Sequence, residues 1–201
     1  DTIARCYEDY PSAPNFGGRT HNDYAEGIFV GYRYFDRYPE KVLWPFGFGL
    51  SYTTFALEPA RFARGSVTVT VTNTGDKAGK DVVELYYSAP YTPGGIEKSE
   101  VVLGGFAKTE TLEPGASETV SISFSTEDMM SYDYLTNQAY VLEKGEYIVS
   151  INENAHTVID SKTYEVPEDV ICGEDNKRQS DQIAATNQFD YANGGVTYLS
   201  R

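Results

Sequence analysis

Carboxylates are the most numerous groups in this sequence that could do chemistry. The 201 residues include 30 aspartates and glutamates but only 16 lysines and arginines. Two carboxyl groups held at a fixed separation can act as acid and base in a hydrolytic reaction. Adjacent acidic pairs occur at Glu8-Asp9, Glu127-Asp128, Glu168-Asp169 and Glu174-Asp175. With so many acidic residues such pairs arise by chance, so they indicate surface and not a catalytic pair.

The other reactive side chains lack the spacing that chemistry requires. His21 and His156 are the only histidines, and neither has a metal-ligand pattern around it. Ser51 is not in a Gly-x-Ser-x-Gly nucleophile elbow, and the sequence has no glycine loop of the phosphate-binding type. We therefore predict no catalytic residue in this segment, no metal site and no cofactor.

Two predicted loops carry side chains that could touch a polyhydroxylated substrate. Arg19 and Asp23 flank a polar loop, and their side chains suit sugar hydroxyls, which both donate and accept hydrogen bonds. Tyr91 lies in the loop 89–96, where an exposed ring could stack on a sugar. These three are the candidate substrate-binding residues. Packing between domains is the competing interpretation for both loops, and the one we favour.

From Tyr52 to about Val166 the pattern is that of short antiparallel strands. Apolar residues alternate with polar ones in 67–72, 82–87, 119–124 and 147–152. Gly and Pro turn signals separate these runs, and about seven strands in such a length is typical of a β-sandwich. We expect the inward-facing residues to be buried, namely Val69, Val71, Leu85, Val120, Ile122, Phe124 and Val149.

The region before Tyr52 has a different pattern. Ile28, Val30 and Tyr32 alternate with residues that are also largely apolar, which predicts a strand covered on both faces. Glu26 and Arg33 would then lie on opposite faces, and we expect them to form structural ion pairs at a domain junction. The stretch 44–50 alternates aromatic residues with Pro and Gly, which indicates tight turns and an aromatic plug between two domains.

Two blocks of this region carry a resemblance to a known family. They read Tyr24-Ala-Glu-Gly-Ile-Phe-Val-Gly-Tyr-Arg-Tyr-Phe-Asp36 and Trp44-Pro-Phe-Gly-Phe-Gly-Leu-Ser-Tyr-Thr-Thr-Phe55. They resemble the end of the α/β sandwich domain of family 3 glycoside hydrolases, the β-glucosidases and β-xylosidases. Motifs that resemble the fibronectin-III-like domain of these enzymes follow at Val69–Gly75, Leu103–Phe106, Leu112–Gly115 and Lys144–Tyr147.

The resemblance implies a domain organisation. Residues 1–51 would be the C-terminal end of an incomplete α/β sandwich domain, and residues 52–166 a fibronectin-III/immunoglobulin-like antiparallel β-sandwich, so that the fold class is mainly β. Residues 167–201 would be a polar linker and a lead-in to another domain, because 168–182 is rich in charged and amide residues. The final stretch, residues 187–201, regains aromatic residues and resembles the lead-in to the barrel in members with reversed domain order, in which a (β/α)₈ barrel follows.

The resemblance also implies where the chemistry would be. Retaining glycosidases use two carboxyl groups about 5–5.5 Å apart. In this family the nucleophilic aspartate lies on the barrel and the acid/base glutamate lies upstream of Asp1, and no position here matches either. We therefore expect a structural, accessory part of a retaining β-glycosidase that is inactive by itself, and of the activities in this class we favour that of a β-glucosidase. Its partners would be the remaining domains of the enzyme and, through the complete enzyme, a β-glucoside or related oligosaccharide.

Composition limits the alternatives. A formal net charge of −14 argues against nucleic acid and anionic membranes as partners, and no apolar run approaches a membrane span. Cys6 and Cys172 form no metal motif, and we favour two free thiols. Free thiols are typical of a reducing compartment, which slightly favours the cytoplasm. A non-catalytic carbohydrate-binding or adhesion module is the alternative function, and it would require a row of exposed aromatics on one strand face.

Overall fold

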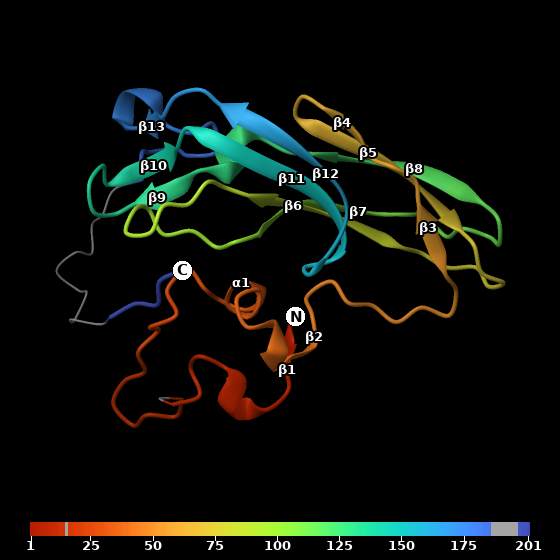
Figure 1. Cartoon of the computed structure of the whole chain (residues 1–201), viewed down its shortest axis with the longest axis horizontal. Helices are drawn as coiled ribbons and strands as arrows, with labels where there is room; N and C mark the ends of the chain where they lie inside the picture. The colour runs from red at the N-terminus through yellow and green to blue at the C-terminus, as the bar shows by residue number, and fades with distance from the viewer. Residues whose placement is uncertain (15, 186–196) are drawn as a thin grey trace.

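Two antiparallel four-stranded sheets form the main body of the protein (Figure 1). The computed structural model describes residues 1–14, 16–185 and 197–201. One sheet has the order β12-β11-β6-β7. The other has the order β3-β5-β4, with β8 paired to the opposite edge of β5. The strands are β3 (Phe55–Leu57), β4 (Arg61–Ala63), β5 (Ser66–Asn73), β6 (Val82–Ser88), β7 (Val102–Lys108), β8 (Ser117–Ser123), β11 (Gly145–Asn154) and β12 (Thr157–Val166).

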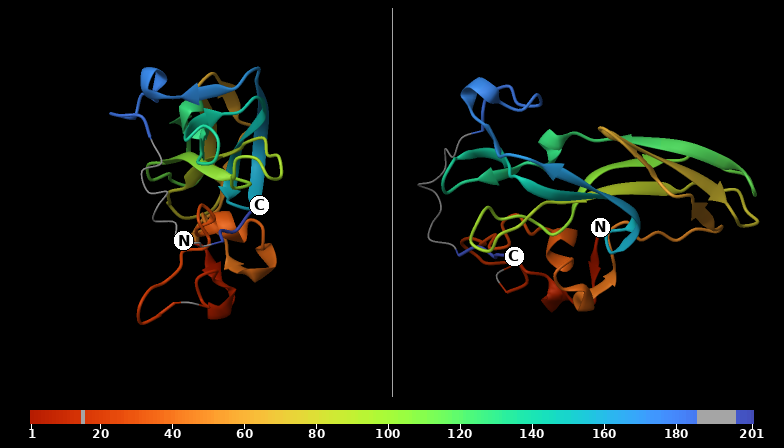
Figure 2. Two further views of the ribbon diagram at one scale, coloured as in Figure 1. Left: turned by 90° about the vertical axis from the view of Figure 1, so that its left-hand side faces the viewer. Right: turned by 45° about the horizontal axis from the view of Figure 1, so that its top comes forward.

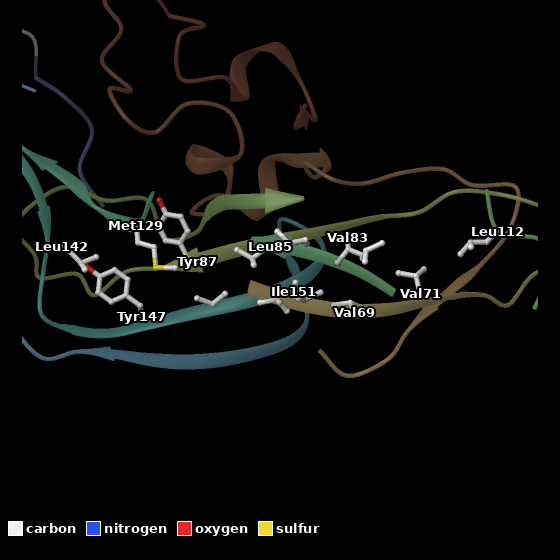
Figure 3. Close-up of a cluster of buried hydrophobic side chains, with 14 residues drawn as sticks. Val69, Val71, Val83, Leu85, Tyr87, Leu112, Met129, Leu142, Tyr147 and Ile151 are labelled. Carbon is white, nitrogen blue, oxygen red and sulfur yellow. The ribbon is translucent and has the colours of Figure 1, made fainter. Parts of the chain in front are cut away.

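The core lies between the two sheets and is built from the predicted period-two residues (Figure 3). Six of the seven predicted core residues are buried: Val69, Val71, Leu85, Val120, Ile122 and Val149. Phe124 is only partly buried, because it comes one residue after β8 ends. The mainly β, antiparallel sandwich is therefore confirmed, and residues 117–123 form a strand as expected.

Glycines in β7 leave room for core side chains of its own sheet and of the facing sheet. A Cβ atom on Gly104 would lie 2.8 Å from Leu85 Cδ2, and one on Gly105 would lie 2.8 Å from Ile122 Cγ2. Either methyl group would collide with a core side chain. The Leu103-Gly-Gly-Phe106 motif is thus a packing requirement of the sandwich.

A third, smaller sheet extends the sandwich at one end. It has the order β13-β10-β9, formed by β9 (Ser131–Asp133), β10 (Ala139–Leu142) and β13 (Val170–Cys172). The 3₁₀ turns η3 (Thr126–Met129) and η4 (Glu174–Asn176) flank it. The expectation of a solvated linker is wrong for 170–172, because Val170 and Ile171 pair with β10 and Cys172 is buried. Both cysteines are free thiols, as expected.

The N-terminal segment, residues 1–52, packs on the opposite side of the β6 sheet from the core (Figures 1 and 2). It contains β1 (Ile3–Ala4) paired with β2 (Val42–Trp44), the short helix α1 (Tyr32–Phe35), and the 3₁₀ turns η1 (Tyr7–Asp9) and η2 (Pro39–Lys41). Its own small core consists of Ala4, Phe29, Tyr34, Phe35 and Val42.

The predicted strand through Ile28, Val30 and Tyr32 is wrong. Residues 25–28 form turns, and Tyr32 begins α1. Gly27 and Gly31 adopt positive φ angles of +55° and +60°, which interrupt an extended backbone at both ends of this stretch. No helix among the described residues has the length and apolar character needed to cross a membrane.

Candidate functional site

Strand β6 is buried on both faces, and its second face defines the candidate site. Val83, Leu85 and Tyr87 point into the sandwich core, whereas Glu84 and Tyr86 lie on the other face and are also buried. Asn152 of β11 and Phe106 of β7 lie opposite Glu84 on the two neighbouring strands. The three residues are therefore on the same face of the sheet. This face meets the N-terminal segment, so we call the contact region the junction.

Aromatic rings from the N-terminal segment cover Tyr86. The Tyr32 ring, in α1, lies 6.0 Å from the Tyr86 ring at an interplanar angle of 85°, and 5.0 Å from the Phe46 ring. Edge-to-face pairs of this kind stabilise beyond their buried area. The backbone N–H of Leu103 donates to the Tyr32 hydroxyl at 2.9 Å, and that of Ala155 donates to the Phe46 carbonyl at 2.9 Å. Of the predicted aromatic plug at 44–50, only Phe46 makes this contact, because Trp44 and Phe48 are exposed and stack on each other, and Leu50 is exposed as well.

Glu84 forms the polar centre of the junction. Its carboxylate accepts a 2.7 Å hydrogen bond from the Tyr86 hydroxyl, and burial raises its pKa. Burial also raises the pKa of Tyr86, which keeps the phenol a donor. Gly47 approaches this carboxylate so closely that a Cβ atom there would lie 2.3 Å from Oε2. The glycine of the Pro45-Phe-Gly47 turn is thus the residue that lets the backbone pass over Glu84.

Asp36 and His156 form a second polar contact at the junction. The Asp36 side chain is 6% exposed, and its Oδ1 lies 3.6 Å from His156 Nε2. Burial, reinforced by the negative charge of Glu100, raises the pKa of Asp36 to about 8. Burial lowers the pKa of His156. Neither oxygen of Asp36 has a hydrogen-bond partner among the described residues, so at neutral pH the protonated carboxyl is the preferred form.

The arrangement favours positioning over catalysis. Asn152 is 1% exposed, and its side-chain amide has no hydrogen-bond partner in the described part of the chain. It is therefore buried in the junction like Glu84 and Asp36. The described residues contain no group of three or more His, Cys, Asp or Glu side chains that could hold a metal ion. A small hollow lies nearby, where the N-terminal segment meets residues 197–201, and it is lined by Phe29, Tyr34, Arg37, Tyr38, Leu199 and Ser200. It has no carboxyl group in its lining, so it cannot supply an acid and a nucleophile.

The three candidate substrate contacts lie outside this centre. Arg19 and Asp23 are exposed residues in the irregular stretch before α1. Tyr91 lies in the β6–β7 loop and is partly buried, with its hydroxyl donating to the Arg201 carbonyl at 3.3 Å. The Arg201 guanidinium lies over the Tyr91 ring, 4.8 Å from its centroid. In this structure a side chain of the protein itself therefore covers the tyrosine ring.

The expected ion pairs of Glu26 and Arg33 are not observed. Glu26 is buried, but neither it nor Arg33 takes part in a salt bridge between described residues. The Arg33 guanidinium instead lies 5.9 Å from the Tyr32 ring centroid. The prediction failed because it placed both residues on a strand, whereas a turn and α1 give their side chains different directions.

Sequence reasoning missed Asp36, Glu84 and Asn152 as junction residues. One signal was available: the second face of β6 carries Val82 and Tyr86 beside Glu84, whereas the outer face of β5 carries threonines. A tyrosine and a valine on a supposed outer face indicate that something covers it. No sequence signal indicated that Asp36 would be buried.

Comparisons with known proteins identify the sandwich. Residues 81–155 match the family model described as fibronectin type III-like domain. The chain is 43% identical over 198 residues to β-glucosidase A of Butyrivibrio fibrisolvens, an alignment that covers 85% of this chain and 24% of that protein. The chain thus spans only about a quarter of the length of this relative.

Solved structures give the same result. A β-glucosidase from Paenibacillus barengoltzii superimposes with a TM-score of 0.77 at 40% identity, covering 85% of this chain and 20% of that one. The β-glucosidase of Kluyveromyces marxianus in complex with glucose gives a TM-score of 0.74 at 34% identity, covering 85% and 21%. The chain therefore contains a fibronectin type III-like domain and is related, in sequence and in structure, to the β-glucosidases of glycoside hydrolase family 3.

Proposed function

We propose that this chain is the accessory, non-catalytic part of a retaining β-glucosidase that removes terminal β-linked glucose from oligosaccharides or aryl glucosides. Its role is to hold the fibronectin type III-like sandwich against the segment that precedes it. The main support for this role is that β6 is buried on both faces. Its second face is covered by the two motif blocks, through Tyr32 in the first and Gly47 in the second. A free-standing sandwich would leave that face to solvent.

The substrate class follows from the relatives. The Kluyveromyces marxianus structure contains glucose, and 43% identity to the Butyrivibrio fibrisolvens protein supports the same class of sugar for the enzyme of which this chain would be part. Double displacement by two carboxyl groups requires no cofactor. The catalytic pair would lie in other domains, with the acid/base glutamate before Asp1 and the nucleophilic aspartate on a barrel after Arg201.

The alternative, a carbohydrate-binding or adhesion module, has less support. Such a module needs an exposed row of aromatics to stack on sugar rings. The outer face of β5 and β8 instead carries hydroxyl pairs, with Thr70 and Thr119 joined at 3.0 Å and Thr72 and Ser117 at 2.8 Å. Small polar side chains offer no stacking surface.

An assay of this chain on an aryl β-glucoside tests the proposal. We expect no turnover above the uncatalysed rate, with the complete Butyrivibrio fibrisolvens relative as the positive control. Turnover that is abolished when a single carboxylate of this chain is changed to its amide would place the active site here and overturn the proposal. Sequencing the parent gene tests the domain order, since a stop codon soon after Arg201 would rule out a following barrel.

A further inference from the structure

The C-terminal residues 197–201, which we call the strap, lie beside α1 at the edge of the junction (Figures 1 and 2). Their first set of contacts is with the N-terminal segment. The Leu199 N–H donates to the Ala25 carbonyl at 2.8 Å, and Arg37 Nη1 donates to the Ser200 carbonyl at 2.6 Å. The Tyr198 ring packs on Gly27, where an added Cβ atom would lie 3.4 Å from the ring.

The second set of contacts is with the β6–β7 loop of the sandwich. A single carboxylate, that of Glu97, accepts from the Ser200 hydroxyl at 2.5 Å and from the Arg201 N–H at 3.2 Å. The Tyr91 hydroxyl donates a hydrogen bond to the Arg201 carbonyl, and the Tyr91 ring lies beneath the Arg201 guanidinium. Three successive residues of the strap therefore bond to two parts of the chain that are far apart in sequence.

The neighbouring charges leave Glu97 available for the strap. Lys98, the adjacent cation, is buried and paired with Glu143. Burial, followed by the positive charge of Arg201, lowers the pKa of Lys98 to about 8. Because Lys98 is engaged elsewhere, the groups that meet the Glu97 carboxylate are the strap's own hydroxyl and N–H donors. Hydrogen bonds to a charged acceptor are stronger than neutral ones.

We propose that the strap is a docking element that fastens the N-terminal segment to the sandwich, with Arg37 and Glu97 as its two anchors. The surface that contacts it extends from the turn 25–28 to the β6–β7 loop. The bound segment is the strap, which belongs to this same chain. It is recognised through its backbone carbonyls, the Ser200 hydroxyl and the Arg201 side chain. The inference is independent of the enzyme's substrate, because it concerns only how the junction is closed.

Amide hydrogen exchange in the full chain, followed residue by residue by NMR, tests the strap. In a Glu97→Ala variant we expect exchange at Leu199 and Arg201 to accelerate about ten-fold, as for loss of a charged hydrogen bond. Exchange in the turn 25–29 should accelerate as well, because the strap holds it. Amides of β5 and β8 should keep their wild-type protection.

Two further variants complete the experiment. Glu110→Ala removes a glutamate that pairs with Lys80 at 3.1 Å on another loop, and it should leave the strap unchanged. Ser200→Ala removes only one hydroxyl and should give a smaller acceleration in the same residues. Unchanged strap exchange in Glu97→Ala overturns the proposal. So does an equal acceleration throughout the chain, since that would report global destabilisation and not release of the strap.

Discussion

The sandwich core and the junction are stabilised by different chemistry. The core is made mainly of valine, leucine and isoleucine side chains on paired strands, with Tyr87, Met129 and Tyr147 beside them, and the backbone groups of its strands are satisfied by the sheet ladders. The junction is made of tyrosine rings, two buried carboxyl groups and one glycine turn. The core therefore depends on apolar volume, whereas the junction depends on exact contacts between residues distant in sequence. Substitutions in the two regions should differ in size, in spatial extent and in pH dependence.

The largest effect is expected in the core. Leu85 is fully buried, so Leu85→Ala should lower the free energy of unfolding by about 2–5 kcal/mol through lost transfer energy and the cavity left behind. Denaturant unfolding, followed by circular dichroism, measures it. The matched control is Leu135→Ala, at an exposed position, which should change stability by less than about 0.5 kcal/mol. Equal effects of the two variants would contradict the core assignment.

The same contrast explains what could be predicted from the sequence. In β5 and β8 each strand has one apolar face, so a period of two was enough to place Val69 and Ile122 in the core. The fold class was predictable as well, and within the stretch 44–50 so was the contact of Phe46. Between residues 24 and 36 both alternating sets are apolar, and the pattern could not separate a strand from a turn followed by a short helix.

The candidate site was harder to predict because its residues are joined only by tertiary contacts. Burial of Asp36 depends on the approach of the β11–β12 hairpin, which brings His156 to it from 120 positions away in the chain. No pattern among neighbouring residues in the sequence indicates a contact between residues so far apart in the chain. The role of Tyr91 in substrate binding stays a prediction, and the sequence did not show that Arg201 would cover its ring.

An intermediate effect is expected at Gly47. Its φ of +84° and the Glu84 carboxylate 2.3 Å from an added Cβ atom both oppose a side chain. Gly47→Ala should therefore destabilise the junction by about 1–3 kcal/mol. Gly94→Ala is the matched control, since Gly94 has a φ of +79° but nothing within 4 Å of an added Cβ atom. The difference between the two variants isolates the contact with Glu84.

Hydrogen exchange shows where the Gly47 effect is confined. Protection of the Ala155 N–H, which bonds to the Phe46 carbonyl, should fall in Gly47→Ala. Protection within β5 should not fall, because the core does not depend on the junction. If β5 loses protection to the same extent, core and junction form one cooperative unit and the comparison between them fails.

The effect most specific to the junction is the pH dependence of Asp36. Its pKa rises from 3.8 to about 8 on folding, so the folded state keeps a proton that the unfolded chain has already released above pH 4. Stability is therefore lost as the pH rises from about 4 to 8. Asp36→Asn cannot titrate and keeps nearly the same shape. Relative to wild type, its free energy of unfolding should be unchanged near pH 4 and higher at pH 8, with a difference that grows steadily between these two values.

His156 supplies the opposite slope and so serves as the control. Its pKa is lowered on folding, so its contribution is present above the unfolded value of 6.5 and is lost as the pH falls below it. His156→Gln should remove that loss at low pH without removing the Asp36 slope. Thermal unfolding of both variants between pH 4 and 8 separates the two groups. A wild-type and Asp36→Asn difference that does not change with pH would mean that Asp36 is ionised in the folded state, and the junction would then contain a buried ion pair with His156 instead of a buried neutral acid.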